Sequence, residues 1–325
     1  MIWKVASRYK LTNNTSLRGG IATGFRAPSL HQVFFQNIST QFIDGNILQV
    51  GTFNNESALA AQAFNVDRLS PELSNHYSLG LSSKINANFS LALDYYYIAI
   101  KDRIVLSGLI SDGYEEILEP FGVGAAQFFT NAIDTDTQGV DLALVYKNKV
   151  GNGNLESSLG FNINTTTVGK DIRVPIAFEG AEEVIFSREE IGRLEKGQPK
   201  YKLSWRSFYD IEKFKIHFNN TLFGPVEYFH PDDGNSDNWV VNDFTGNVES
   251  RDQKFSAKVL TDFSIHYQFH SRVSAAIGGN NIFNVYPDKH THSSNTSNGN
   301  FTYSRRVGQF GVQGRNYFVS LSLSL

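Results

Sequence analysis

The chain has 325 residues, a net charge of -3 and no cysteine, which excludes disulfides, zinc–thiolate sites and cysteine nucleophiles. Because there is no basic excess, we expect no nucleic-acid partner. No run of about 18 apolar residues occurs, so we expect no membrane-spanning helix. Aromatic residues form 13% of the chain, an abundance that suits the interfacial girdles of membrane barrels.

In chain order, eleven segments show the alternation of apolar and polar residues that predicts β-strands. The first segment begins at once, with Trp3, Val5 and Tyr9 alternating with small and basic residues, and no signal-peptide core precedes it. We therefore expect the chain to be part of a longer protein. The predicted strands lie at 2–10, 16–26, 74–84, 89–105, 137–148, 154–166, 199–209, 214–224, 254–269, 273–284 and 314–325.

The connections between these segments alternate between short and long. Short ones such as 12–15 and 151–153 are rich in Asn and Gly, which suit tight hairpins. Short turns on one rim and long loops on the other are typical of outer-membrane barrels. We predict that the short turns face the periplasm and that the long loops face outward, at 27–73, 106–136, 167–198, 225–253 and 285–313.

The alternation also assigns side chains to two faces, because successive strand residues point in opposite directions. In the segment 254–269 we place the odd-numbered residues, Phe255 included, on a lipid face and the even-numbered residues on a lumen face. The closing segment alternates up to Leu325, and only Phe318 interrupts its polar set. Many long segments of this kind in series predict an all-β fold, an antiparallel transmembrane β-barrel with a polar lumen.

Three segments carry motifs. Residues 23–30 read T-G-F-R-A-P-S-L, and residues 69–80 read L-S-P-E-L-S-N-H-Y-S-L-G. Residues 279–287 read G-N-N-I-F-N-V-Y-P, and G-R-N-Y-F follows at 314–318. Together, and in this order, they resemble the corresponding segments of TonB-dependent outer-membrane receptors. From the residues alone we expect the motifs to serve the architecture, because their prolines and glycines suit strand ends and bends.

The resemblance implies a barrel of about 22 strands with an N-terminal plug. Residues 1–325 would then be the C-terminal part of the barrel, with about eleven strands, and the plug and first strands would be absent. It further implies a location in the outer membrane of a Gram-negative bacterium, in contact with outer-membrane lipid. The TonB complex would act through the missing N-terminal region and energise the uptake of a scarce ligand. The ligand class stays open among siderophores, cobalamin, haem, oligosaccharides and peptides.

The candidates for ligand contact lie in the predicted outer loops. Aromatic side chains there can bury apolar ligand surface, and arginines can hold an anion bidentately. Packing between loops and pairing with acids are the alternative interpretations. An H-x-H pair can hold a metal, but without an identifiable third ligand we predict no metal site. The candidates are Arg26, Phe34, Phe35, Tyr228, Trp239, His290, His292 and Arg305.

We predict neither an enzyme nor a cofactor, because no G-x-S-x-G turn and no H-E-x-x-H helix occurs. The segment 187–196 predicts a helical turn within a loop, with Glu189 and Arg193 at helical spacing. Asp232 and Asp233 are interpreted as solvated loop charges. Alternative functions are a passive porin or an outer-membrane adhesin on a similar barrel, or a soluble carbohydrate-binding β-sandwich.

Overall fold

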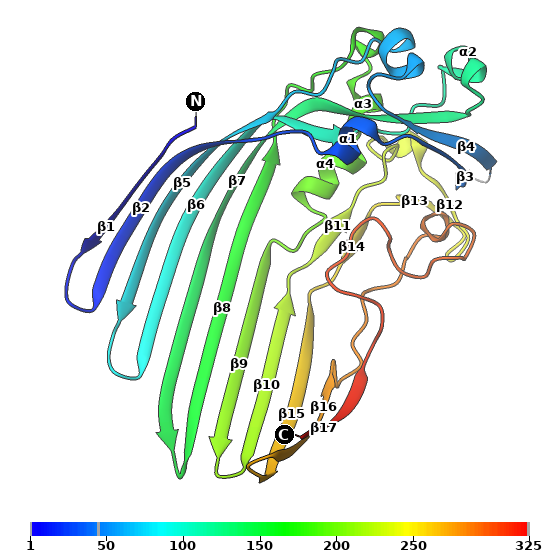
Figure 1. The fold of residues 1–325 in the computed structure, drawn as a ribbon. Coiled ribbons are helices and arrows are strands. Elements are labelled where there is room, and N and C mark those ends of the chain that lie inside the picture. The colour runs from blue at the N-terminus through cyan, green and yellow to red at the C-terminus, as the bar shows by residue number, and fades with distance from the viewer. Residues whose placement is uncertain (1, 44–45, 324–325) are drawn as a thin grey trace.

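A computed structural model describes residues 2–43 and 46–323 as a curved sheet with folded loops along one rim (Figure 1). Within these residues, eleven strands pair antiparallel in chain order. They are β1 (Lys4–Lys10), β2 (Thr15–Arg26), β5 (Glu72–Lys84), β6 (Phe89–Leu106), β7 (Ala125–Val150), β8 (Gly153–Val168), β9 (Tyr201–Ile211), β10 (Phe214–Phe223), β15 (Lys258–His270), β16 (Val273–Asn280) and β17 (Asn316–Leu323).

The predicted fold class is confirmed, since the eleven expected strands form one antiparallel sheet of the outer-membrane barrel type. The sheet is open, with β1 at one edge and β17 at the other. Because every successive pair on this path is antiparallel, β1 and β17 run in the same direction. No helix in the described part of the chain is both long and apolar enough to cross a membrane.

Three predicted strand boundaries were wrong. Strand β7 begins at Ala125, 12 residues before the predicted start at 137, because residues such as Phe128 and Ile133 are buried and show no polar alternation. Strand β16 ends at Asn280 because Asn281 adopts a φ of 49° and turns the chain. Strand β15 begins at Lys258. The predicted end of the last strand, Leu325, lies outside the described residues.

The cross-strand register fixes the two faces, because directly paired residues share a face. One row joins Ile216, Ile265, Ile277 and Val319 from β10 to β17. Its last two members are 62% and 79% exposed, as expected for side chains that meet lipid. His266 lies in the neighbouring row on the opposite face. The register therefore places Ile265 in an apolar row and His266 on the opposite face, in agreement with the predicted alternation, and the assignment of the apolar row to lipid stays a prediction.

Phe255 is an exception to the predicted faces. It lies in the short strand β14 (Gln253–Phe255), beyond the barrel strand, and is 2% exposed. It packs with Val226, Tyr228 and Val307 in a small apolar cluster between loops. The assignment of Phe255 to the lipid face was therefore wrong, because the period-two pattern continues through the two-residue break that separates β14 from β15.

Phe318, the one apolar residue in its polar row, lies directly opposite Gly278. A Cβ atom on Gly278 would stand 2.7 Å from the Cζ atom of the Phe318 ring. Tyr317 covers Gly279 in the same way on the other face, with its Cδ1 atom 2.7 Å from the corresponding position. Each ring therefore fills the space that a glycine leaves open, which stabilises strands at such positions.

Gly80, the last residue of the second motif, has a different role. It lies between Arg18 on β2 and Asp94 on β6 in one cross-strand row. The Arg18 Nε atom donates a hydrogen bond of 2.9 Å to Asp94 Oδ1 across the glycine. A Cβ atom on Gly80 would stand 2.7 Å from that Nε atom and would also overlap Asp94. The missing side chain lets an ion pair span two strand intervals.

The remaining elements lie along the rim that carries the long loops, opposite the short turns (Figure 1). They are α1 (Leu30–Phe34), β3 (Asn37–Ile43), β4 (Asn46–Phe53), η1 (Ala58–Ala63), α2 (Glu115–Leu118), η2 (Glu119–Phe121), η3 (Ile176–Phe178), α3 (Glu182–Ile185), α4 (Arg188–Glu195), β11 (Val226–Tyr228), η4 (Ser236–Asn238), β12 (Val240–Asn242), β13 (Asn247–Glu249), β14 and η5 (Ser293–Thr296). The helix expected within 187–196 is thus confirmed as α4.

The largest apolar core lies in these loops, around the first residues of β7. The ring centroids of Phe64 and Phe178 are 5.1 Å apart, and those of Phe64 and Phe128 are 6.2 Å apart. Leu59, Ile110, Leu118, Ile185 and Phe186 are among the other buried members of this cluster. Three long loops therefore share one core and form an ordered cap over the rim.

Candidate functional site

The first two motifs meet at the loop rim through Arg26 and Glu72. The Arg26 Nε atom donates a hydrogen bond of 2.7 Å to Glu72 Oε2, and Nη2 pairs with Oε1. Glu72 Oε1 also accepts the backbone N–H of Ile104 at 2.8 Å. The carboxylate is buried while the guanidinium is half exposed. One carboxylate thus joins β2, β5 and β6 at the rim.

The third motif closes the loop between β16 and β17. The side-chain amide of Asn281 donates to the Val285 carbonyl at 2.7 Å, and its Oδ1 accepts the Val285 N–H at 2.9 Å. Asn284 Oδ1 accepts the backbone N–H of Arg315 at 3.1 Å. The two halves of the motif are therefore tied together, which agrees with the expected architectural role.

Phe34 and Phe35 lie at the end of α1, in the first long loop. Ser29 and Gln32 form a reciprocal capping box that begins this short helix. The Phe35 ring stacks on His31 with a centroid distance of 4.3 Å. Phe34 is 66% exposed and therefore presents an apolar surface on the loop side of the sheet.

The loop between β10 and β15 is locked to the loop between β16 and β17. Gln253 donates to the Lys289 carbonyl at 2.7 Å and accepts the Thr291 N–H at 3.2 Å. Asn242 donates to the Thr291 carbonyl and accepts the Ser293 N–H, both at 2.9 Å. The side-chain amides of Gln253 and Asn242 thus bind the backbone of the β16–β17 loop and join the two loops.

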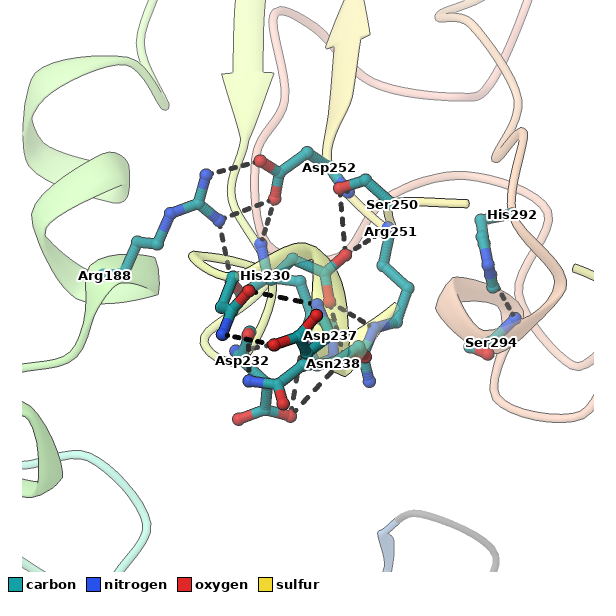
Figure 2. A network of polar contacts seen from close by, with 12 residues as sticks. Arg188, His230, Asp232, Asp237, Asn238, Ser250, Arg251, Asp252, His292 and Ser294 are labelled. Carbon is teal, nitrogen blue, oxygen red and sulfur yellow. Dashed lines mark hydrogen bonds and ion pairs between the residues drawn. The ribbon is translucent and has the colours of Figure 1, made fainter. Parts of the chain in front are cut away.

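His290 and His292 lie within this junction. His290 is half-buried, and burial, followed by the charge of Arg305, lowers its pKa, so the neutral imidazole is favoured. His292 is 2% exposed, and its Nδ1 atom accepts the Ser294 N–H at 3.2 Å (Figure 2). Across residues 2–43 and 46–323, no three His, Cys, Asp or Glu side chains are grouped to hold a metal.

The other candidates differ in how far they are exposed. Tyr228 is buried, and burial raises the pKa of its hydroxyl above the ordinary range. The Arg305 guanidinium lies 3.9 Å from the centroid of Phe301 and donates to Ser297 Oγ at 3.1 Å. Trp239 is 39% exposed. Trp239 and Arg305 therefore remain predictions for ligand contact, whereas Tyr228 is placed to pack the loops.

The eight candidates are distributed over three of the long loops. Arg26, Phe34 and Phe35 lie in or beside the first long loop, whereas the other five lie in the last two.

A polar network between α4 and the β10–β15 loop was missed by sequence reasoning (Figure 2). Arg188 pairs with Asp252, with Nη1 2.8 Å from Oδ1, and the same Oδ1 accepts the His230 N–H at 2.8 Å.

Asp233 was interpreted as a solvated loop charge, and that interpretation was wrong. It is 6% exposed, and Arg251 Nε donates to its Oδ1 at 2.8 Å. Burial acts to raise the pKa of this carboxyl, but hydrogen bonds from Arg251 and Ser250 outweigh burial and lower it. Its neighbour Asp232 is exposed, so the sequence offered no signal that separates the two.

Helix α4 is held from a second side by Glu189. Its Oε1 atom lies 3.2 Å from Arg306 Nε in the β16–β17 loop. Burial raises the pKa of Glu189, although Arg306 acts in the opposite direction. With Arg188 paired to Asp252, two adjacent α4 residues connect the helix to both of the following loops. We call this pair of contacts the α4 clamp.

An antiparallel sheet with an apolar face, a polar face and ordered loops along one rim defines the wall of an outer-membrane-type β-barrel. The chain belongs to the TonB-dependent receptor family, because the sequence model described as "TonB dependent receptor-like, beta-barrel" matches residues 2–282. This is a family of receptors and transporters, whose barrels reside in the outer membrane of Gram-negative bacteria. None of the curated protein sequences compared with the chain matches it.

Several solved structures have a similar fold. A mutant of the ferric enterobactin receptor of Pseudomonas aeruginosa, in complex with enterobactin, aligns with 98% of this chain and 40% of its own, at 16% identity and a TM-score of 0.61. The copper transporter OprC aligns with 99% and 39%, at 16% identity and a TM-score of 0.59. The siderophore receptor PirA of Acinetobacter baumannii aligns with 99% and 40%, at 16% identity and a TM-score of 0.57. The chain thus spans about 40% of the length of these relatives, and the likeness concerns the fold.

Proposed function

We propose that this chain forms the C-terminal part of the barrel wall in an outer-membrane receptor that imports a scarce ligand with energy supplied through TonB. In this proposal the first strands and the plug come from the rest of the protein. The TonB complex acts on that N-terminal region, and the outer face of the wall contacts outer-membrane lipid. The ligand class stays open among siderophores, cobalamin, haem, oligosaccharides and peptides.

The observation that carries the proposal is the ordered cap on one rim of an otherwise regular sheet. A passive pore needs an open path past its loops. Here the first three long loops share a buried core, and the β10–β15 and β16–β17 loops are joined by side-chain amide hydrogen bonds. A receptor needs such preorganised loops, because ordering mobile loops on binding would reduce affinity. An enzymatic role has no support from a family of receptors and transporters.

The proposal is tested by ligand uptake in cells that express the complete protein, in matched strains with and without TonB. A panel of labelled siderophores, cobalamin, haem, oligosaccharides and peptides is offered at low concentration. We expect one class to accumulate only with TonB, while surface binding of that class persists without it. Uptake that rises linearly with concentration and ignores TonB would show a passive porin instead.

The predicted ligand contacts are tested with the class that the panel identifies. Trp239→Ala should weaken surface binding if the exposed indole contacts ligand. Trp205→Ala is the matched control, because Trp205 lies on the apolar face of β9 with its Nε1 atom bound to Ser157 Oγ at 2.9 Å. Equal binding by the two variants and the unaltered receptor would remove Trp239 from the site.

A further inference from the structure

A cavity of about 420 Å³ lies between α4 and the inner wall of the sheet. Its volume falls within the range of about 300–1,000 Å³ that small-molecule sites occupy. We call it the α4 pocket. The lining side chains that matter for its chemistry are Arg103, Asn164, Thr166, Arg193, Glu195 and Lys200.

A bulge in β6 turns Arg103 toward this pocket. Ile100 pairs with Thr135 across the strands, so these two residues share a face. Strict alternation would aim Arg103 at the opposite face. The register shifts between Ile100 and Arg103, where Asp102 adopts a φ of 55°. Arg103 Nη1 consequently donates to Thr135 Oγ1 at 3.1 Å. Bulges are known to re-aim side chains at functional sites.

The pocket contains more positive than negative charge. Its one carboxylate, Glu195, accepts the Val168 N–H at 2.8 Å, and Arg193 pairs with Glu190 at 2.9 Å. Within the described part of the chain, neither Arg103 nor Lys200 has a carboxylate oxygen within 4.0 Å. Two cationic groups therefore face the cavity, and the carboxylates that act on them, Glu72 on Arg103 and Glu195 and Glu227 on Lys200, lie beyond ion-pair distance.

A second lysine, Lys196, lies beside Lys200 outside the lining of the pocket. Contact and repulsion between the two amino groups lower the pKa of Lys200, although Glu227 and Glu195 act in the opposite direction. Like charges held together raise the free energy of the empty site, and an anion between them would relieve it. Asn164 and Thr166 add neutral polar groups to the same lining.

We propose that the α4 pocket binds a small polyanion through its carboxylate or phosphate groups, with Arg103 and Lys200 as the principal contacts. Arginine offers a planar fork and lysine a compact charge, and both make short hydrogen bonds to anionic oxygens. This inference rests on the proposed function, because it names the chemical class of the imported ligand or of the part of the ligand that reaches the lumen. The α4 clamp fixes the helix that covers the pocket.

The test uses the complete receptor, purified in detergent, and titration calorimetry. Citrate is the carboxylate probe, tripolyphosphate is the phosphate probe, and sucrose is the uncharged control. We expect at least one polyanion to bind and to weaken as salt rises, while sucrose does not bind. Arg103→Gln and Lys200→Gln should each weaken that binding about tenfold or more, because hydrogen bonds to charged groups contribute strongly.

Lys202→Gln is the matched control, because it removes the same charge from the next inner-facing position of β9. Lys202 does not line the pocket, and its ammonium lies 4.9 Å from the centroid of the Phe223 ring. This variant should bind the probe as the unaltered receptor does. If all three variants lose affinity equally, a diffuse positive lumen accounts for binding and the pocket is overturned as a site.

Two other outcomes also overturn the inference. One is that neither polyanion binds the folded receptor. The other is a structure of the complete receptor in which a carboxylate of its own chain lies between Arg103 and Lys200. Neither outcome affects TonB-dependent uptake, which tests the proposed function separately. Conversely, calorimetric binding does not require TonB, so polyanion binding without energised uptake would refute the proposed function alone.

Discussion

Truncating Arg26 should destabilise the barrel more than neutralising its partner Glu72. The Glu72 side chain is 8% exposed, whereas that of Arg26 is 52% exposed. Arg26→Ala leaves a buried carboxylate with the Ile104 N–H as its remaining described donor. Breaking a fully buried pair costs about 3–5 kcal/mol. Because the Arg26 side chain is about half exposed to solvent, we expect Arg26→Ala to lower the free energy of unfolding by about 2–3 kcal/mol.

Glu72→Gln has a smaller expected cost. The glutamine keeps an acceptor for the Ile104 N–H, and the released guanidinium can turn into water. We expect a loss of about 1 kcal/mol, as for a single hydrogen bond. Arg68→Ala is the control, because its pair with Glu56 is largely exposed on both sides and should contribute nothing measurable.

The three variants are compared by denaturant unfolding of the complete receptor in phospholipid bilayers. The predicted order of destabilisation is Arg26→Ala, then Glu72→Gln, then Arg68→Ala. A double variant of Arg26 and Glu72 should lose less than the sum of the two single losses, because the pair acts as a unit. If Glu72→Gln costs as much as Arg26→Ala, the burial asymmetry does not govern this contact and the reasoning fails.

Three further predictions concern the wall and the α4 clamp. Ile265→Arg should cost about 2–4 kcal/mol of unfolding free energy in bilayers and His266→Arg much less, and equal losses would contradict the assigned faces. Gly80→Ala should break the ion pair that crosses it and cost about 1 kcal/mol, whereas Gly160→Ala, with nothing within 4 Å of its new methyl group, should cost less. Burial raises the pKa of Glu189 above its ordinary 4.5, so the protonated carboxyl favours the folded state of α4, and this contribution is lost as pH rises through the raised value. Protection factors for hydrogen exchange in α4, which divide out the intrinsic pH dependence of exchange, should therefore fall as pH rises, and Glu189→Gln should remove that fall; a variant whose protection factors respond to pH as those of the unaltered receptor do would exclude this carboxyl as the cause.

The strands of the sheet could be predicted because period-two alternation depends only on two faces meeting different surroundings. Where that condition holds, as in β10 and β15, predicted and observed faces agree. It fails at the start of β7, where Ala125, Ala126 and Phe128 are buried within the cap and no polar face exists. A strand with two buried faces gives no alternation and cannot be distinguished from a loop by period.

The loops could not be predicted because their structure depends on contacts between distant segments. Asp232 and Asp233 are neighbours of the same type, yet one is exposed and the other is held by Arg251. Nothing in the local sequence distinguishes them. The bulge that turns Arg103 inward is hidden for the same reason, since its cause is the pairing of β6 with β7. The motifs, in contrast, were expected to serve the architecture, and Arg26, Glu72, Asn281 and Asn284 within them make contacts that join strands or loop segments.

The candidate contacts differ in whether their side chains are engaged in the structure or exposed. Arg26 and Tyr228 were both candidates for ligand contact from the sequence. In the structure Arg26 pairs with Glu72, and Tyr228 packs in a small apolar cluster. The exposed Phe34 and Trp239 keep surface for a ligand. The exposed fraction of a side chain therefore separates the candidates that stabilise the rim from those that remain predicted ligand contacts. The sequence does not reveal this fraction.

The claim that this chain is one part of a larger closed wall is tested most directly by refolding the 325 residues alone into detergent. The edges β1 and β17 run in the same direction, whereas bacterial single-chain barrels close with antiparallel strands. Each unpaired backbone group that faces hydrocarbon costs several kcal/mol, so an open edge is unfavourable in a membrane. We predict aggregation, or closure with a second chain, and no heat-modifiable monomer on gels. A stable, heat-modifiable monomer that imports ligand into vesicles without TonB would contradict the account.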